Sequence, residues 1–278
     1  GLHKGFVHFD EELVDTESNW SYAQNAEPVS ERGVRWIEQK AAARDAIGET
    51  RPWFLWLHYF DPHDLYLEHP EYEEAFGQKT DLERYDGEIA YTDKSVGTVL
   101  DALEAHGYAE ETVVVFVADH GEEFHDHGAV LHGHTLYQEL VHVPFVIRAP
   151  GIDPARVSLG VHHADILPTV CSLLSVEPRG PLAGRDVSPA MRGDDLRERP
   201  LLLQTANNPT LVKDALVHDG YKLIVHRDRE GERVELFDLG ADPRELSDVA
   251  GDQPDRVATM RDLLDRKVAQ ANDATQGY

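Results

Sequence analysis

The sequence predicts an α/β protein in which helices flank a mixed or parallel sheet, followed by a small antiparallel sheet with one helix. Two observations support the first part: continuous apolar runs of strand length end in polar residues, and helix-length amphipathic segments separate them. A third observation supports the second part, because short strand-like runs follow a stretch rich in Gly, Pro, Arg and Asp at residues 180–200. We therefore expect an α/β portion over residues 1–190 and an α+β subdomain over residues 200–278.

The first half of the chain contains two predicted helices and one predicted strand. Apolar residues recur at helical spacing over residues 29–46 and again over 82–106, where a glycine follows the last apolar position. Between the helices, residues 52–59 form a continuous apolar run that is typical of a strand buried on both faces. The polar residues 60–64 then form a loop that carries His63.

Two further strands and a short helix complete the predicted α/β portion. Residues 112–118, which read Thr-Val-Val-Val-Phe-Val-Ala, give the clearest strand pattern in the chain. A third strand is predicted at 143–148 and a helix at 164–176. In the last third, short strands separated by turn residues and one final helix are predicted at 201–204, 214–217, 221–226, 233–237 and 253–269.

The composition excludes several classes of function. The 278 residues include 52 acidic and 26 basic side chains, a net charge of -26, which opposes binding to nucleic acid. A mean hydropathy of -0.46 and the lack of an apolar run near ~20 residues exclude a membrane span. The single cysteine, Cys171, excludes an intramolecular disulfide and lies in an apolar pattern typical of an inert core thiol. The sequence does not decide whether the protein is cytoplasmic or exported.

Six of the sixteen histidines lie between residues 120 and 142, and we expect the functional site there. Asp119 and His120 directly follow the strand at 112–118, and ligands bind beyond the carboxyl ends of strands in open α/β sheets. A carboxylate and an imidazole together can hold Ca²⁺, Mg²⁺, Mn²⁺ or Zn²⁺; the alternative is a loop carboxylate beside a surface imidazole. If the strands are parallel, His63 lies at the same sheet edge as Asp119.

Two more histidines border a glycine in the segment His132-Gly133-His134. Glycine allows close approach of the backbone to a ligand, and imidazoles can donate hydrogen bonds to an oxyanion or protonate a leaving group. The alternative is that each is an ordinary surface histidine. The sequence contains no Gly-x-Ser-x-Gly elbow, no P-loop and no dinucleotide fingerprint.

Five segments, taken in order, resemble the sulfatase family of the alkaline phosphatase superfamily. They lie at residues 56–63, 85–93, 117–123, 132–144 and 235–245. The resemblance covers nearly the whole chain but only the C-terminal part of the family pattern. It implies an alkaline-phosphatase-like sheet, a divalent ion that is usually Ca²⁺, and a formylglycine that attacks the sulfur of a sulfate ester.

The resemblance also assigns roles to individual residues. It implies that Asp119 and His120 are the second pair of metal ligands and that His63 contacts the sulfate or helps to handle the leaving group. Many relatives have a sulfate-binding lysine near the position of Gly133. Either His132 or His134 would replace that cation here, and we favour His134.

Some family features have no counterpart in the sequence. The first pair of metal-binding aspartates and the Cys or Ser that becomes formylglycine belong to the family's N-terminal half, and residues 1–50 do not supply them. We therefore expect a C-terminal sulfatase fragment, inactive alone, that needs the N-terminal half as a second chain or missing segment and acts on a small-molecule or glycan ester. The alternatives are a phosphodiesterase or phosphonate monoester hydrolase of the same superfamily, and a non-catalytic ligand-binding module.

Overall fold

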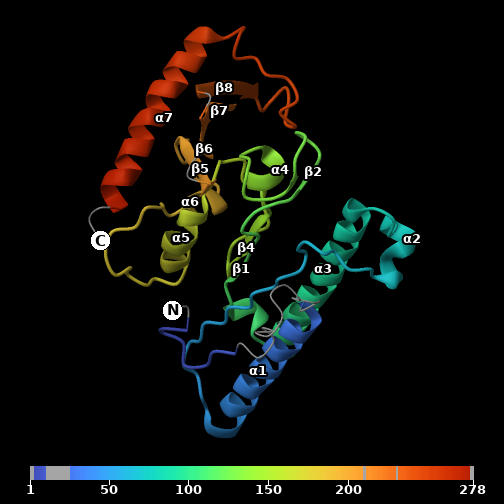
Figure 1. The fold of residues 1–278 in the computed structure, drawn as a ribbon. Coiled ribbons are helices and arrows are strands. Elements are labelled where there is room, and N and C mark those ends of the chain that lie inside the picture. Colours follow the sequence, from blue (N-terminus) through green and yellow to red (C-terminus); the bar gives the residue numbers. More distant parts are fainter. Residues whose placement is uncertain (1–2, 11–25, 209–210, 230, 276–278) are drawn as a thin grey trace. The chain divides into compact units, whose positions relative to one another are not determined.

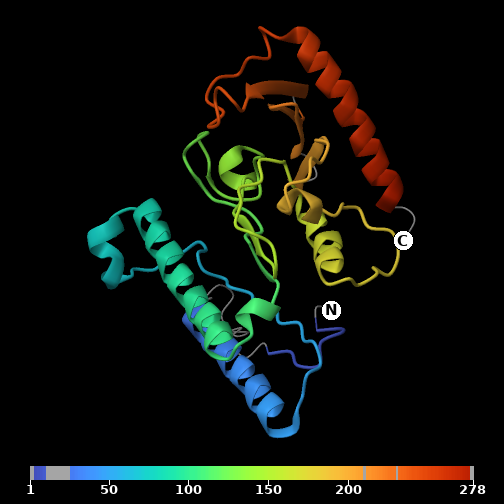
Figure 2. The same ribbon diagram turned by 180° about the vertical axis from the view of Figure 1, so that it is seen from behind.

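The structure, a computed structural model, describes residues 3–10, 26–208, 211–229 and 231–275. The chain divides into two compact units, Gly1–Thr112 and Val113–Tyr278 (Figures 1 and 2). Within the described ranges, no helix combines the length and the apolar composition that a membrane span needs.

Two long helices dominate the first unit. α1 (Ala26–Ile47) and α3 (Asp81–Ala105) lie side by side in both views. Thr80 caps α3 through reciprocal hydrogen bonds with Glu83, which satisfy N–H groups that a first helical turn leaves without partners. Both helices predicted from apolar spacing are confirmed, with ends that differ by at most three residues. The short elements of this unit are η1 (Pro70–Tyr72), α2 (Glu73–Phe76) and η2 (Ala109–Glu111).

The apolar run at residues 52–59 pairs with no described strand, so the predicted strand is wrong. Its side chains alternate between half-buried and exposed, as they do in an extended chain. Trp53 packs edge-on against Tyr108, with ring centroids 5.6 Å apart, whereas Phe54 and Trp56 are 71% and 53% exposed. A local apolar pattern cannot specify a hydrogen-bonding partner, and that partner is what makes an extended segment a strand.

The second unit begins with two small antiparallel sheets. β1 (Val114–Val117) pairs with β4 (Phe145–Arg148), and β2 (Glu123–Phe124) pairs with β3 (Val130–Leu131). The predicted parallel pairing is therefore wrong for the part of the chain that the structure describes. Parallel neighbours usually need a crossover helix, and the only helix among the described residues between β1 and β4 is the four-residue α4 (Gln138–Val141). Other short helices are η3 (His163–Asp165), α5 (Ile166–Leu173) and α6 (Ser188–Met191).

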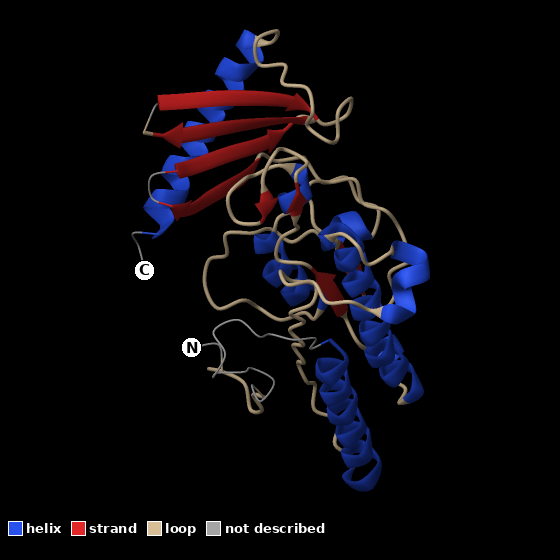
Figure 3. Cartoon of the chain, turned by 45° about the vertical axis from the view of Figure 1, so that its right-hand side comes forward, coloured by secondary structure: helices blue, strands red, loops and turns tan. Residues whose placement is uncertain are grey.

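A four-stranded antiparallel sheet with one helix forms the end of the second unit (Figure 3). Leu223 and Val225 pack with Met260 and Leu264 of the helix, while Ile224 packs on the other face of the sheet in a cluster with Leu136. Because successive side chains of a strand point to opposite sides, Leu223 and Ile224 of the same strand lie in the two different clusters. The small antiparallel sheet and its helix are thus confirmed. They comprise β5 (Leu201–Asn208), β6 (Leu211–His218), β7 (Tyr221–Asp228), β8 (Gly231–Asp238) and α7 (Pro254–Thr275).

Candidate functional site

Asp119 and His120 lie in the turn that directly follows β1. The backbone N–H of Gly121 donates to the carbonyl of Leu140 at 2.8 Å, which holds this turn against α4. A side chain at Gly121 would place its Cβ 1.9 Å from the carbonyl oxygen of Glu139, so the close approach requires glycine. The Asp119 side chain is 82% exposed and that of His120 is 41% exposed. Both groups are therefore accessible to a ligand.

Asp119 and His120 could together ligate a divalent cation. His120 Nδ1 lies 2.9 Å from the carbonyl oxygen of Gly121, and because a carbonyl can only accept, Nδ1 donates the hydrogen bond. The Nε2 atom of the same ring lies 3.7 Å from Asp119 Oδ2. A backbone acceptor at the other ring nitrogen is the usual arrangement of metal-binding histidines. Among the described residues, no three metal-binding side chains gather, so these two are an incomplete ligand set.

His132 lies against this pair. Its ring stacks on that of His120, with centroids 4.1 Å apart, and its Nδ1 lies 3.1 Å from Glu122 Oε1. The Glu122 side chain is almost fully buried, so it holds one edge of the His132 ring in place. The structure thus places His132 beside the candidate metal ligands.

His134 has both ring nitrogens directed into the protein. Nδ1 donates to the carbonyl oxygen of His132 at 3.0 Å. Nε2 is buried without a hydrogen bond of normal geometry among the described residues and lies 3.6 Å from Glu123 Oε2. Lys213 of β6 donates to the His134 carbonyl, and Thr205 of β5 donates to that of Gly133 at 2.9 Å. The C-terminal sheet therefore holds the backbone of this histidine segment.

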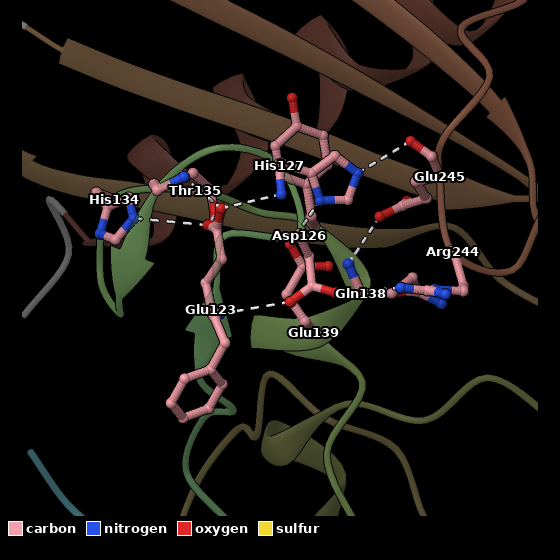
Figure 4. A network of polar contacts seen from close by, with 12 residues as sticks. Glu123, Asp126, His127, His134, Thr135, Gln138, Glu139, Arg244 and Glu245 are labelled. Carbon is pink, nitrogen blue, oxygen red and sulfur yellow. Dashed lines mark hydrogen bonds and ion pairs between the residues drawn. The ribbon is translucent and has the colours of Figure 1, made fainter. Parts of the chain in front are cut away.

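A buried carboxylate organises the loop that contains these histidines (Figure 4). Glu123 is fully buried. Its carboxylate accepts hydrogen bonds from the backbone N–H of Ala129 at 2.8 Å, the backbone N–H of His127 at 3.2 Å and the Thr135 hydroxyl at 3.1 Å. One side chain of β2 thus fixes the connection between β2 and α4.

His127 connects this loop to the C-terminal part of the unit (Figure 4). Its Nδ1 lies 2.6 Å from Glu139 Oε1, its Nε2 donates to the Glu245 carbonyl at 3.0 Å, and its ring stacks on Tyr137 with centroids 3.7 Å apart. Burial lowers the pKa of His127, but the Glu245 carbonyl and the Glu139 carboxylate together raise it above its ordinary value. The protonated ring can donate to both acceptors, whereas a neutral ring can donate to only one.

We expect His127→Gln to lower the free energy of unfolding by about 1–3 kcal/mol near pH 6, because it removes charged hydrogen bonds. Folding raises the pKa of His127, so its contribution is complete below the unfolded-state value near ~6.5 and declines as the pH rises through the folded-state value. Urea unfolding near pH 6 and pH 9 checks this, with the exposed His142→Asn as the control. An equal loss at both pH values would contradict it.

A buried ion pair lies beside His127, and the sequence analysis missed it. Lys222 of β7 and Glu245 are both fully buried, with Nζ and Oε1 3.0 Å apart. Glu245 Oε2 also accepts from the backbone N–H of Gln138 at the start of α4, at 2.7 Å. The available signal was a lysine within the otherwise apolar run Tyr-Lys-Leu-Ile-Val at 221–225.

His63 belongs to the first unit and is half-buried in the loop before α3. Its ring stacks on Phe60, with centroids 4.2 Å apart. The expectation that His63 and Asp119 share a sheet edge depended on parallel pairing of their strands, which the described residues do not show. A common site for these two residues stays a prediction.

An exposed carboxylate and imidazole directly after a strand, bordered by further histidines, form the kind of site that metal-dependent hydrolases use. Residues 14–176, more than half of the chain, match the family model described as "Sulfatase". The chain therefore belongs to the sulfatase family.

Known relatives and solved structures agree with this membership. The chain is 29% identical over 199 residues to a Delta 4,5-hexuronate-2-O-sulfatase of Bacteroides thetaiotaomicron, and the match covers 65% of this chain and 39% of that protein. The fold is similar to the crystal structure of the sulfatase-like protein yidJ from Bacteroides fragilis, with a TM-score of 0.76 at 20% identity over 90% of this chain and 60% of that one. This similarity shows a mixed α/β fold of the sulfatase type.

A third similarity is to the phosphonate monoester hydrolase of Agrobacterium radiobacter. Its TM-score is 0.57 at 25% identity, and it covers 68% of this chain and 41% of that one. In these comparisons the chain thus spans between about two-fifths and three-fifths of the length of its relatives.

Proposed function

We propose that this chain supplies part of the active site of a sulfuric ester hydrolase. The observation that carries the proposal is the Asp119–His120 pair, exposed and 3.7 Å apart, within the residues that match the sulfatase family. Asp119 Oδ2 and His120 Nε2 would hold a divalent ion, with Ca²⁺ the first choice and Mg²⁺, Mn²⁺ or Zn²⁺ the alternatives. The bound cation would draw charge from the non-bridging oxygens of the ester group.

Three histidines have proposed roles in the reaction. His132 stacks on His120 and would donate a hydrogen bond to a sulfate oxygen. We now prefer His132 to His134 for this role, because both ring nitrogens of His134 are directed into the protein. His63 would donate a proton to the leaving oxygen as its bond to sulfur breaks.

In this proposal, the residues described above do not supply the nucleophile or the other metal ligands. We infer that the formylglycine nucleophile and the other metal ligands belong to the N-terminal half of the enzyme, present as a second chain or as a further segment. Mass spectrometry of the purified protein, native and then denatured, tests this inference. A formylglycine on a copurifying chain or segment would support it, and a preparation that hydrolyses sulfate esters without any formylglycine would contradict it.

We expect Asp119→Asn to abolish hydrolysis of an aryl sulfate or a sugar 2-O-sulfate and to weaken Ca²⁺ binding. The amide keeps the size of the carboxylate but removes a charge that a hard cation prefers. Ca²⁺-dependent elevation of the melting temperature measures binding without turnover. Asp93→Asn, an exposed carboxylate on α3, is the control. The metal assignment fails if the Asp119 variant keeps the Ca²⁺-dependent elevation.

A second candidate function is phosphonate or phosphodiester hydrolysis. The similarity to the Agrobacterium phosphonate monoester hydrolase favours it, and a cation with imidazoles serves phosphoryl transfer equally well. Parallel assays with an aryl sulfate, an aryl phosphonate and an aryl phosphodiester decide between the two functions. Ligand-dependent stabilisation by sulfate or phosphate esters without turnover would instead indicate a binding module.

A further inference from the structure

The loop that carries His63 is anchored to both long helices of the first unit. Asp61 Oδ2 accepts a hydrogen bond from the backbone N–H of Ala26 in α1 at 2.8 Å. The carbonyl of Asp61 accepts a hydrogen bond from the Thr92 hydroxyl of α3 at 3.3 Å. These contacts fix the chain on the N-terminal side of His63.

A buried carboxyl group of α3 anchors the other side of the loop. Glu88 is only 2% exposed, and its Oε1 accepts a hydrogen bond from the backbone N–H of Leu67 at 2.8 Å. The backbone N–H of His63 also acts on this carboxyl group and favours its charged form. Glu88 therefore holds the loop backbone through its hydrogen bond at Leu67, four residues beyond His63.

The surroundings of Glu88 make its charge state responsive near neutral pH. Burial raises its pKa from 4.5 to about 7, with a smaller contribution from the nearby Asp61 carboxylate, while the two backbone N–H groups oppose this rise. Two other ionisable side chains, His69 and Tyr91, stack on each other and interact electrostatically with Asp61. A glutamine would fill the same space and accept from Leu67 without any ionisation.

We propose that Glu88 is a positioning residue for His63, holding from α3 the backbone of the loop that presents the imidazole. Its effect on catalysis depends on the proposed function, but the anchoring does not. A purely space-filling side chain would make no hydrogen bond to the loop. The Glu88 carboxyl group, in contrast, accepts one from the backbone N–H of Leu67.

Hydrogen exchange of the loop amides tests the anchoring in the intact protein. We expect Glu88→Ala to speed exchange at Leu67 by about tenfold or more, because it removes the acceptor. Glu88→Gln should keep the protection, since its amide oxygen can still accept from Leu67. Glu83→Ala is the matched control, because it weakens the cap of the same helix without contacting the loop. No change in Glu88→Ala, or an equal change in Glu83→Ala, would overturn the proposal.

The pH dependence of this exchange is a second measurement. A side chain at position 88 that only filled space would not change it. Burial raises the pKa of Glu88 from the solvated value of 4.5 to about 7, so an opening of the loop that exposes this carboxyl group to water becomes less costly as the pH rises over that range. After correction for intrinsic exchange, protection at Leu67 should therefore fall over this range in the wild type. It should stay constant in Glu88→Gln, and a persisting fall in that variant would contradict the assignment to Glu88.

Kinetics separate this proposal from the proposed function. If the protein hydrolyses sulfate esters, Glu88→Ala should lower kcat more than it changes KM, and Glu88→Gln should restore kcat. An unchanged kcat in Glu88→Ala would overturn the positioning role while leaving the proposed function intact. If the wild type hydrolyses none of the test esters even together with the N-terminal half, the proposed function fails, and exchange at Leu67 still decides whether Glu88 anchors the loop.

Discussion

Lys222→Ala is expected to lower the free energy of unfolding of the second unit by about 3–5 kcal/mol, because it leaves the buried Glu245 carboxylate without its cation. Burial lowers the pKa of Lys222 and raises that of Glu245, so neither charge is stable there alone. The loss would extend to α4, because Glu245 also accepts from the backbone N–H of Gln138. Urea unfolding monitored by circular dichroism measures the change.

A double variant separates the cost of an unpaired charge from the value of the pair. Replacing both partners with apolar residues of similar size, Lys222→Met with Glu245→Leu, should recover part of the stability that Lys222→Ala loses. Lys94→Ala, which removes an exposed ammonium group, serves as the control and should change the free energy of unfolding by less than about 0.5 kcal/mol. The double variant would be no more stable than Lys222→Ala if the loss came only from packing.

This ion pair illustrates what the sequence could not predict. The strand around residue 222 is visible locally, because a short and mostly apolar run lies between turn residues. The partner Glu245 lies on a separate loop beyond β8, and nothing in the local pattern of either residue specifies the other. Buried polar groups need partners, so a lysine in a buried strand indicates that a partner exists without identifying it.

The candidate site shows the same division between local and long-range information. The strand ending at Asp119 was predicted correctly, because a run of β-branched residues that ends in a charged one is a local signal. The direction in which this strand pairs was predicted wrongly, because the direction depends on the path of the chain between β1 and β4. The proposal of His132 over His134 rests on the positions of the ring nitrogens, which the spacing His-Gly-His does not encode.

His63→Ala is expected to lower kcat by about 10²–10⁴-fold for sulfate esters of alkyl or sugar alcohols, because their leaving oxygens need a proton as the bond to sulfur breaks. The same variant should lose much less activity toward p-nitrophenyl sulfate, whose phenolate is stable without protonation. The measurement is kcat for a series of esters that differ in the pKa of the leaving group, compared between wild type and variant. His58→Ala, which removes an exposed histidine before the same loop, is the control.

The dependence on leaving group distinguishes proton donation from other roles of His63. If the imidazole only bound the sulfate group, every ester in the series would lose activity by a similar factor, because all of them carry the same sulfate. A proton donor instead steepens the dependence on the leaving-group pKa when it is removed. Equal losses across the series would therefore assign His63 to anion binding, and the proton donor would have to be sought among other residues.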